Sequence, residues 1–181
     1  MRLFPNSKKV KTNLLEEFRD KKILDLGCKK NRDFSKDCNI GCGVKHDLTK
    51  FPWPISDNSY DLIICQYVLE NLPDIAKTLE EFNRIVKHGG KIFIETAHYT
   101  HEAHRRRHSH RFSLGSFDYF HKGNPYYKTD FALVEKYLFF DDLTFLLGIG
   151  FLANVFPQIY EKRLAFMFPA TSFHVTFEVQ K

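Results

Sequence analysis

The sequence predicts an α/β protein of a single domain, built on one mostly parallel sheet. In residues 22–26 apolar side chains lead up to an acidic residue, and residues 60–65 are a nearly uninterrupted apolar run; both patterns are typical of parallel strands buried on both faces. Residues 173–179 instead alternate apolar and polar side chains, as a half-exposed antiparallel strand does. Together these runs indicate a sheet whose first strands are parallel and whose last strand is reversed.

Composition restricts the class of protein. With 43% hydrophobic and 27% charged residues, the chain of 181 residues is ordinary for a globular protein, and the disordered and fibrous classes are excluded. The net charge of +5 is compatible with an anionic partner such as nucleic acid but does not favour one. No apolar run reaches the ~18 residues of a membrane span, and the four cysteines fit reduced thiols. We therefore expect a cytoplasmic protein without membrane contact, of undetermined oligomeric state.

The amino-terminal region predicts a helix followed by the first strand. Residues 1–11 are basic, and we expect them to form a flexible arm. A short helix is predicted from Asn13 to about residue 20, because Asn13 is a good N-cap and the apolar residues after it share one face. The strand at 22–26 then ends in a tight turn. Ligands of open α/β sheets bind outside the carboxyl ends of the strands, so this turn predicts a binding site.

The middle of the chain predicts a strand, a helix and a second parallel strand. A short, irregular strand is expected at 34–38, before the second apolar run. Pro73 then opens a predicted helix at its favoured first-turn position, and Gly89 and Gly90 end that helix. Residues 91–96 form another buried strand. The order strand, helix, strand predicts a right-handed crossover unit.

The last part of the chain predicts a long polar loop and a different arrangement of elements. Residues 97–125 are polar, rich in His and Arg, and follow the carboxyl end of a strand, so we expect a functional loop there. A strand is predicted at 131–140 and a helix at 156–168. The apolar segment at 143–152 between them fits either element.

Five segments occur in an order and spacing that resemble a known family. They are residues 23–28 (ILDLGC), 46–48 (HDL), 59–63 (SYDLI), 68–72 (VLENL) and 85–91 (IVKHGGK). In these segments the chain is similar to the class I S-adenosylmethionine-dependent methyltransferases, and more narrowly to the small type-11 group. Residues 97–100 (AHYT) and 111–120 (RFSLGSFDYF) resemble a subgroup with a histidine motif in the loop after its fifth strand. The resemblance covers nearly the whole chain.

This resemblance implies a Rossmann-like sheet of about seven strands, with helices on both faces and an antiparallel C-terminal hairpin. It also implies S-adenosylmethionine as the cofactor, with Asp25 and Gly27 orienting its methionine end. Cys28 lies in the same turn, and Lys29 stands where the family has a second glycine. The other implied cofactor residues are Asp37 for the ribose, with Asp33 as its rival, Asp47 and Leu48 for adenine, and Gln66 and Tyr67 where cofactor and acceptor meet.

Six of the nine histidines lie between residues 98 and 121. A neutral imidazole takes a proton from a hydroxyl or amine near neutral pH, so one or two of them are candidate bases. The candidates are His98, His108 and His110, because these positions match the motif of the subgroup. Two other interpretations stay open: surface residues without function, and a metal site, although the spacing matches no usual zinc pattern. The neighbouring basic residues fit either an anionic acceptor or a solvated face, and they are Arg105, Arg106, Arg107 and Arg111.

The motifs and the resemblance together predict a methyltransferase that uses S-adenosylmethionine. The expected acceptor is an oxygen or nitrogen atom of a small or anionic molecule. One alternative is a catalytically inactive, cofactor-binding or regulatory protein of the same fold, which Lys29 and the short second-strand region favour. The other is a histidine-rich metal-binding protein that uses the sheet only as a scaffold.

Overall fold

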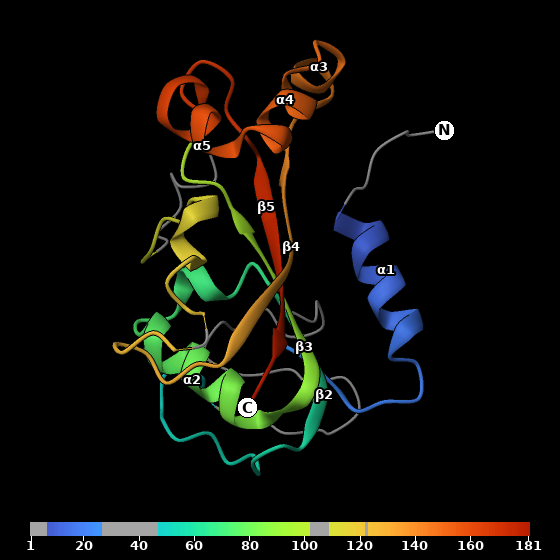
Figure 1. Cartoon of the computed structure of the whole chain (residues 1–181), viewed down its shortest axis with the longest axis vertical. Coiled ribbons are helices and arrows are strands. Elements are labelled where there is room, and N and C mark those ends of the chain that lie inside the picture. The colour runs from blue at the N-terminus through green and yellow to red at the C-terminus, as the bar shows by residue number, and fades with distance from the viewer. Residues whose placement is uncertain (1–6, 27–46, 102–108, 122) are drawn as a thin grey trace.

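The computed structural model describes residues 7–26, 47–101, 109–121 and 123–181. Within these ranges, five strands form one sheet in the order β1-β2-β3-β5-β4 (Figure 1). The strands are β1 (Ile23–Asp25), β2 (Tyr60–Gln66), β3 (Val86–Ala97), β4 (Phe131–Phe139) and β5 (Ser172–Val179). β1, β2 and β3 are parallel, while β5 runs antiparallel to both β3 and β4.

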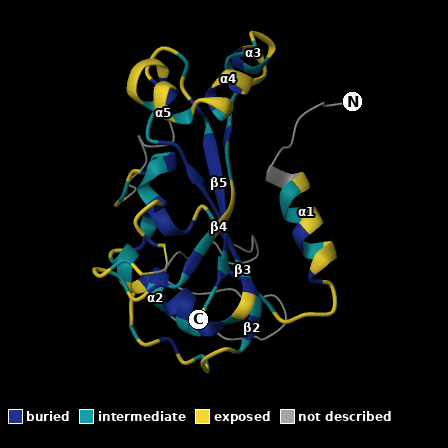
Figure 2. Cartoon of the chain, viewed as in Figure 1, coloured by how far each residue is buried: buried dark blue, intermediate teal, exposed yellow. Residues whose placement is uncertain are grey.

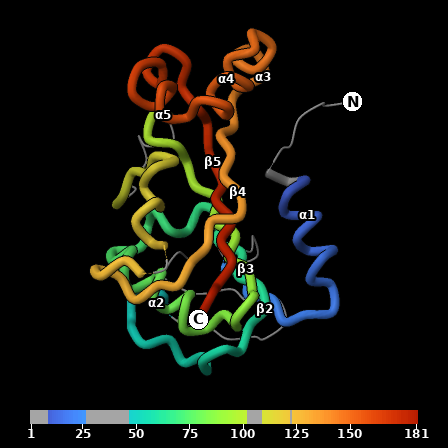
Figure 3. Tube along the Cα trace, in the orientation of Figure 1, coloured from blue at the N-terminus to red at the C-terminus, as the bar shows by residue number. Residues whose placement is uncertain are grey.

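This topology confirms a mixed α/β fold with a parallel first half and a reversed last strand. The trace in Figure 3 shows β5 inserted between β3 and β4, which places the end of the chain inside the sheet. The predicted count of seven strands is not confirmed, because the described residues contain five. The expected strand at 34–38 lies outside the described residues.

The region between β2 and β3 differs from the prediction in where the helix ends. The helix α2 spans Ile75–Ile85, and the Asp74 side chain caps it by accepting a 3.0 Å hydrogen bond from the Lys77 N–H. The predicted helix continued to Gly89 and Gly90, which is wrong, because β3 already begins at Val86. The two glycines lie inside β3, where its register with β2 is irregular. They allow a bulge in a strand rather than ending a helix.

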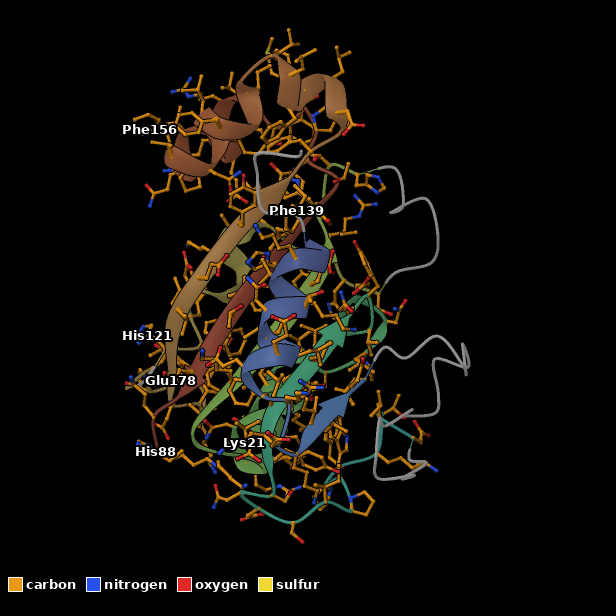
Figure 4. The ribbon with its side chains drawn as sticks, turned by 90° about the vertical axis from the view of Figure 1, so that its right-hand side faces the viewer. Lys21, His88, His121, Phe139, Phe156 and Glu178 are labelled. Carbon is orange, nitrogen blue, oxygen red and sulfur yellow. The ribbon has the colours of Figure 1, made fainter. Side chains whose placement is uncertain are left out.

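The two faces of the sheet are covered by different parts of the chain. The helix α1 (Ser7–Glu17) covers one face (Figure 4). There Leu14 of α1 and Phe18, which follows the helix, belong to a core cluster that includes Phe93 of β3. α2 belongs to the larger core on the other face. The predicted start of α1 at Asn13 is wrong, because residues 7–11, which were expected in the flexible arm, are already helical. Val10 and Lys11 contact the sheet, and such tertiary contacts override weak local helix signals.

A group of short helices lies at one end of the long axis of the molecule (Figure 1). They are α3 (Asp142–Leu146), α4 (Ile149–Val155), α5 (Pro157–Ile159) and the π-helical turn η4 (Tyr160–Leu164). The apolar segment at 143–152 is therefore helical, and the helix predicted at 156–168 is present as α5 and η4. No helix in the described ranges has both the length and the hydropathy needed to traverse a bilayer.

The paired glycines of β3 give a test of the fold. A Cβ at Gly90 would lie 2.8 Å from the Asp61 carbonyl oxygen and 2.6 Å from Val86 Cγ1, whereas a Cβ at Gly89 would meet nothing within 4 Å. Gly90→Ala should therefore lower the free energy of unfolding by roughly 2–3 kcal/mol, since overpacking against backbone does not relax easily.

Gly89→Ala is the matched control, because at φ +73° it introduces backbone strain alone, about 1 kcal/mol. Urea unfolding of both variants measures the difference. An equal or smaller loss for Gly90→Ala would show that the chain does not approach Gly90 as closely as the structure indicates.

Candidate active site

The carboxyl ends of β1, β2 and β3 bring together a network of polar side chains. Asp25, at the end of β1, is only 2% exposed, and its Oδ2 accepts a 3.1 Å hydrogen bond from Lys11 Nζ of α1. Lys11 Nζ also donates to Gln66 Oε1 at 2.6 Å. Gln66 Nε2 in turn donates to Glu95 Oε2 at 2.6 Å, and the Tyr67 hydroxyl donates to Glu95 Oε1 at 3.0 Å. One continuous set of hydrogen bonds thus crosses three strand ends.

Charge balance explains why these residues lie together. A carboxylate buried as deeply as Asp25 requires a cation and hydrogen bonds, and Lys11 supplies both. Tyr67 has a φ of +54°, a left-handed conformation that is strained for a bulky residue, and its hydroxyl returns to Glu95. Burial, together with the charge of Glu95, raises the pKa of Tyr67 well above its usual value, so its hydroxyl remains a donor. The network offers a carboxylate, an ammonium group and an amide at one edge of the sheet.

The predicted cofactor residues fall into three groups, of which the structure describes two. Asp25, Gln66 and Tyr67 belong to the network just described. Asp47 instead forms a local turn, because its Oδ1 accepts hydrogen bonds from the N–H and hydroxyl of Thr49 at 3.0 and 2.8 Å. Leu48 is buried in the larger core. Their contact with adenine stays a prediction. Gly27, Cys28 and Asp37 lie outside the described residues, and so do His108, Asp33, Lys29 and Arg105–Arg107.

His98, at the end of β3, lies in a second buried cluster. Its side chain has no exposed surface, and its Nδ1 is 2.7 Å from Thr100 Oγ1. Its Nε2 is 3.5 Å from Glu161 Oε1, and the same carboxylate oxygen accepts a 2.6 Å hydrogen bond from the Leu114 N–H. The ring of Tyr99 packs against the imidazole, with the centroids 4.4 Å apart. Glu161 therefore joins η4 to both the end of β3 and the loop after it.

The environment of Glu161 favours its charged form. Partial burial acts to raise the pKa of this carboxyl, but the nearby imidazole of His98 and the hydrogen bond from the Leu114 N–H outweigh it and hold the pKa below its usual value. The group is therefore anionic at neutral pH. A carboxylate that contacts an imidazole fixes the orientation of the ring and stabilises its protonated form.

His110 has different polar partners from those of His98. His110 Nε2 is 3.3 Å from the Pro73 carbonyl oxygen, and its backbone N–H donates to the Glu70 carbonyl at 3.1 Å. Both candidate bases nevertheless neighbour Phe112, because His98 forms an isolated β-bridge with it and the ring of His110 lies 6.2 Å from its ring. Among the described residues, no group of three or more His, Cys, Asp or Glu side chains has the arrangement needed to hold a metal ion.

Sequence analysis did not identify Lys11, Glu95 or Glu161 as site residues. Glu95 had a usable signal, since it is an acidic residue at the end of an apolar run, as Asp25 is. Glu161 follows a tyrosine in a region of low periodicity, and Lys11 is one of several lysines in a basic segment. Only the fold brings these two to the strand ends.

Comparisons with known proteins bear on the domain and the fold of this chain. Residues 24–94 match the family model described as "Methyltransferase domain". The chain is 36% identical over 70 residues to a demethylmenaquinone methyltransferase of Staphylococcus saprophyticus. The aligned stretch covers 39% of this chain and 28% of that protein. It is 28% identical over 122 residues to an uncharacterized protein of Methanocaldococcus jannaschii. This alignment covers 50% of this chain and 54% of that protein. The matches thus span no more than about half the length of either curated relative.

Two solved structures share the fold over most of their length. A SAM-dependent methyltransferase from Archaeoglobus fulgidus superimposes with a TM-score of 0.58 at 15% identity, covering 96% of this chain and 95% of that one. An S-adenosylmethionine-dependent methyltransferase from Mesorhizobium loti gives a TM-score of 0.53 at 15% identity, with 87% and 90% covered. The resemblance to class I methyltransferases is therefore confirmed for the domain and for the fold.

Glu161→Gln tests the electrostatic account of the His98 cluster. The side chain of Glu161 is 18% exposed, and we expect its neutralisation to lower the free energy of unfolding by about 1–2 kcal/mol at neutral pH. Because the folded pKa of Glu161 is depressed, this stabilisation is present above the unfolded pKa and is lost as the pH falls through the folded pKa. The difference from the wild type should therefore shrink below about pH 4.5.

Thermal or urea unfolding across the acid range measures this effect. Glu17→Gln, at a surface carboxylate with a 50% exposed side chain, is the control and should change little at any pH. A loss in Glu161→Gln that stays constant down to acid pH would mean that the charge of Glu161 is unimportant.

Proposed function

We propose that this chain, which resembles SAM-dependent methyltransferases in its domain match and its fold, transfers a methyl group from S-adenosylmethionine to an oxygen or nitrogen atom of a small or anionic acceptor. The observation that supports it most directly is the buried Asp25 at the end of β1, paired with Lys11. Ligands of open α/β sheets bind at such strand ends. The proposal assigns the cofactor to this edge of the sheet.

The residues of the network fit the amino-acid end of the cofactor. That end bears an ammonium group and a carboxylate, and the network presents a carboxylate and an ammonium group 3.1 Å apart. We propose that Asp25 holds the cofactor ammonium while Lys11 holds its carboxylate. On binding, the ligand ammonium replaces Lys11 as the partner of Asp25, and the ligand carboxylate replaces Asp25 as the partner of Lys11. Gln66 offers both an acceptor and a donor to the same group. When bound, the cofactor supplies an electrophilic methyl group on its sulfonium.

The acceptor side is assigned to the segment that follows β3. In this proposal His98 removes the proton of the acceptor, with His108 and His110 as the alternatives, and Glu161 stabilises the imidazolium that results. Because the imidazole of His98 is enclosed, the segment has to open before an acceptor reaches it. The rest of the catalysis comes from positioning, since methyl transfer is an in-line displacement.

One observation favours a second candidate function. The full burial of His98 is also what a structural histidine would show, and it supports the interpretation as a cofactor-binding protein without activity. The two functions share the cofactor site and differ only in turnover. A broad panel of acceptors, small and anionic, separates them once cofactor binding has been measured.

Asp25→Ala tests the cofactor site. Without the carboxylate, the ammonium group of the ligand loses a charge-assisted hydrogen bond, and affinity for S-adenosylmethionine should fall at least about tenfold. Calorimetric titration measures the affinity, and circular dichroism checks that the fold persists. Asp118→Ala, which removes an exposed ion pair with Lys136, is the matched control and should bind normally. Unchanged affinity in Asp25→Ala would refute the assignment.

Lys11→Met tests the assignment of the ligand carboxylate. The variant should bind S-adenosylmethionine roughly 10- to 100-fold more weakly than the wild type, since a charged hydrogen bond is lost. It should bind decarboxylated S-adenosylmethionine at least as tightly as the wild type does, because that ligand has no carboxylate for Lys11 to hold and Lys11 no longer occupies Asp25. Lys9→Met, on an exposed position of the same helix, is the control. Tighter binding of S-adenosylmethionine by Lys11→Met would instead show that Lys11 competes with the ligand for Asp25.

A further inference from the structure

The end of the molecule formed by α3, α4, α5 and η4 exposes an unusual amount of apolar surface. We name the exposed apolar side chains of residues 143–167 the apolar cap. Of the sixteen large hydrophobic side chains exposed in the described part of the chain, eleven belong to it. Leu146 is 83% and Phe166 84% exposed. Figure 2 shows this end of the molecule dominated by exposed residues, and Figure 4 places Phe156 at its outer edge.

The area of the apolar cap is that of an interface. Its eleven side chains are between 36% and 84% exposed, so at roughly 150 Å² for a whole side chain they present on the order of 1,000 Å². Soluble monomers rarely expose an apolar patch above about 600 Å². A stable protein interface needs about 800 Å² from each partner, and the more apolar ones belong to homodimers. The apolar cap therefore suffices for one stable protein contact.

The charges at the two ends of the apolar cap complement each other. Asp142 opens α3 at one end, and Lys162 and Arg163 lie in η4 at the other, all three exposed. Figure 1 shows α3 and α5, which leads into η4, on opposite sides of this end of the molecule. A two-fold axis through the middle would bring each acidic end against the basic end of a second copy. Such self-complementarity is what an isologous interface requires.

The position and the charge balance favour a second copy over a lipid surface. The apolar cap lies at one end of the long axis, so another molecule can approach it end to end (Figure 1). Surfaces that bind anionic membranes surround their apolar face with Lys and Arg. Here Asp141 and Asp142 balance Lys162 and Arg163, which gives no preference for an anionic bilayer.

We propose that the apolar cap is a homodimer interface, in which two copies of this chain pack these helices about a two-fold axis with Asp142 of each facing Lys162 and Arg163 of the other. The interface borders the segment after β3, because the ring of Phe166 meets that of Tyr99 edge-on at 5.7 Å. Dimerisation would thus cover apolar surface immediately beside His98. The proposal does not depend on the methyltransferase function and fails or holds separately from it.

Sedimentation equilibrium on the whole chain tests the interface. The wild type should sediment with twice the 21.4 kDa mass of the chain, and Leu146→Glu should sediment as a monomer with unchanged circular dichroism. Tyr126→Glu is the matched control, since Tyr126 is 84% exposed but lies outside the apolar cap, and it should stay dimeric. A wild type that is monomeric up to high micromolar concentration, or that is monomeric and floats with neutral or anionic phospholipid vesicles, would overturn the proposal.

Charge reversal tests the two-fold arrangement. Asp142→Lys and Lys162→Glu should each raise the dimer dissociation constant, because each places like charges against one another across the interface. The double variant restores opposite charges and should recover most of the wild-type dissociation constant. If the two single effects simply add in the double variant, the acidic and basic ends do not meet, and the proposed arrangement is wrong. Circular dichroism of all three variants checks that they are folded.

Discussion

The ion pair between Asp25 and Lys11 is the constraint on which the site depends. A carboxylate with almost no exposed surface at the end of a buried strand is costly unless a cation accompanies it. Lys11 supplies that cation from α1, which lies across the neighbouring face of the sheet. The same ammonium group reaches Gln66, which continues to Glu95 and Tyr67. The first helix and the ends of three strands are therefore coupled through one charge.

A second carboxylate has the corresponding role beside the proposed acceptor site. Glu161 ties η4 to His98 and to the backbone of Leu114. The short helices at the end of the molecule are thus anchored to the segment that follows β3, although this end exposes eleven large apolar side chains. The proposed dimer interface and the proposed acceptor site consequently share one support. A structural change at one of these two sites would therefore be transmitted to the other through Glu161.

The parts of the fold that could be predicted were those with a strong local pattern. The apolar runs located the strands, and the acidic residue after the first run located Asp25. The borders between elements were harder to predict from the sequence. Val86, for example, continues the apolar stripe of a helix and also fits the first position of a strand. Exposed apolar residues at 143–152 concealed the helical period there. Lys11 had no local signature at all, since only the packing of α1 gives it a partner.

The central claim is that the strand ends bind the amino-acid end of a sulfonium nucleoside. A crystal structure of the wild-type chain with S-adenosylhomocysteine tests it most directly, because that ligand has the same amino-acid end. The account predicts that the ligand ammonium lies within hydrogen-bond distance of Asp25, with its carboxylate beside Lys11. A ligand bound elsewhere, with the Lys11 to Asp25 contact intact, would contradict it.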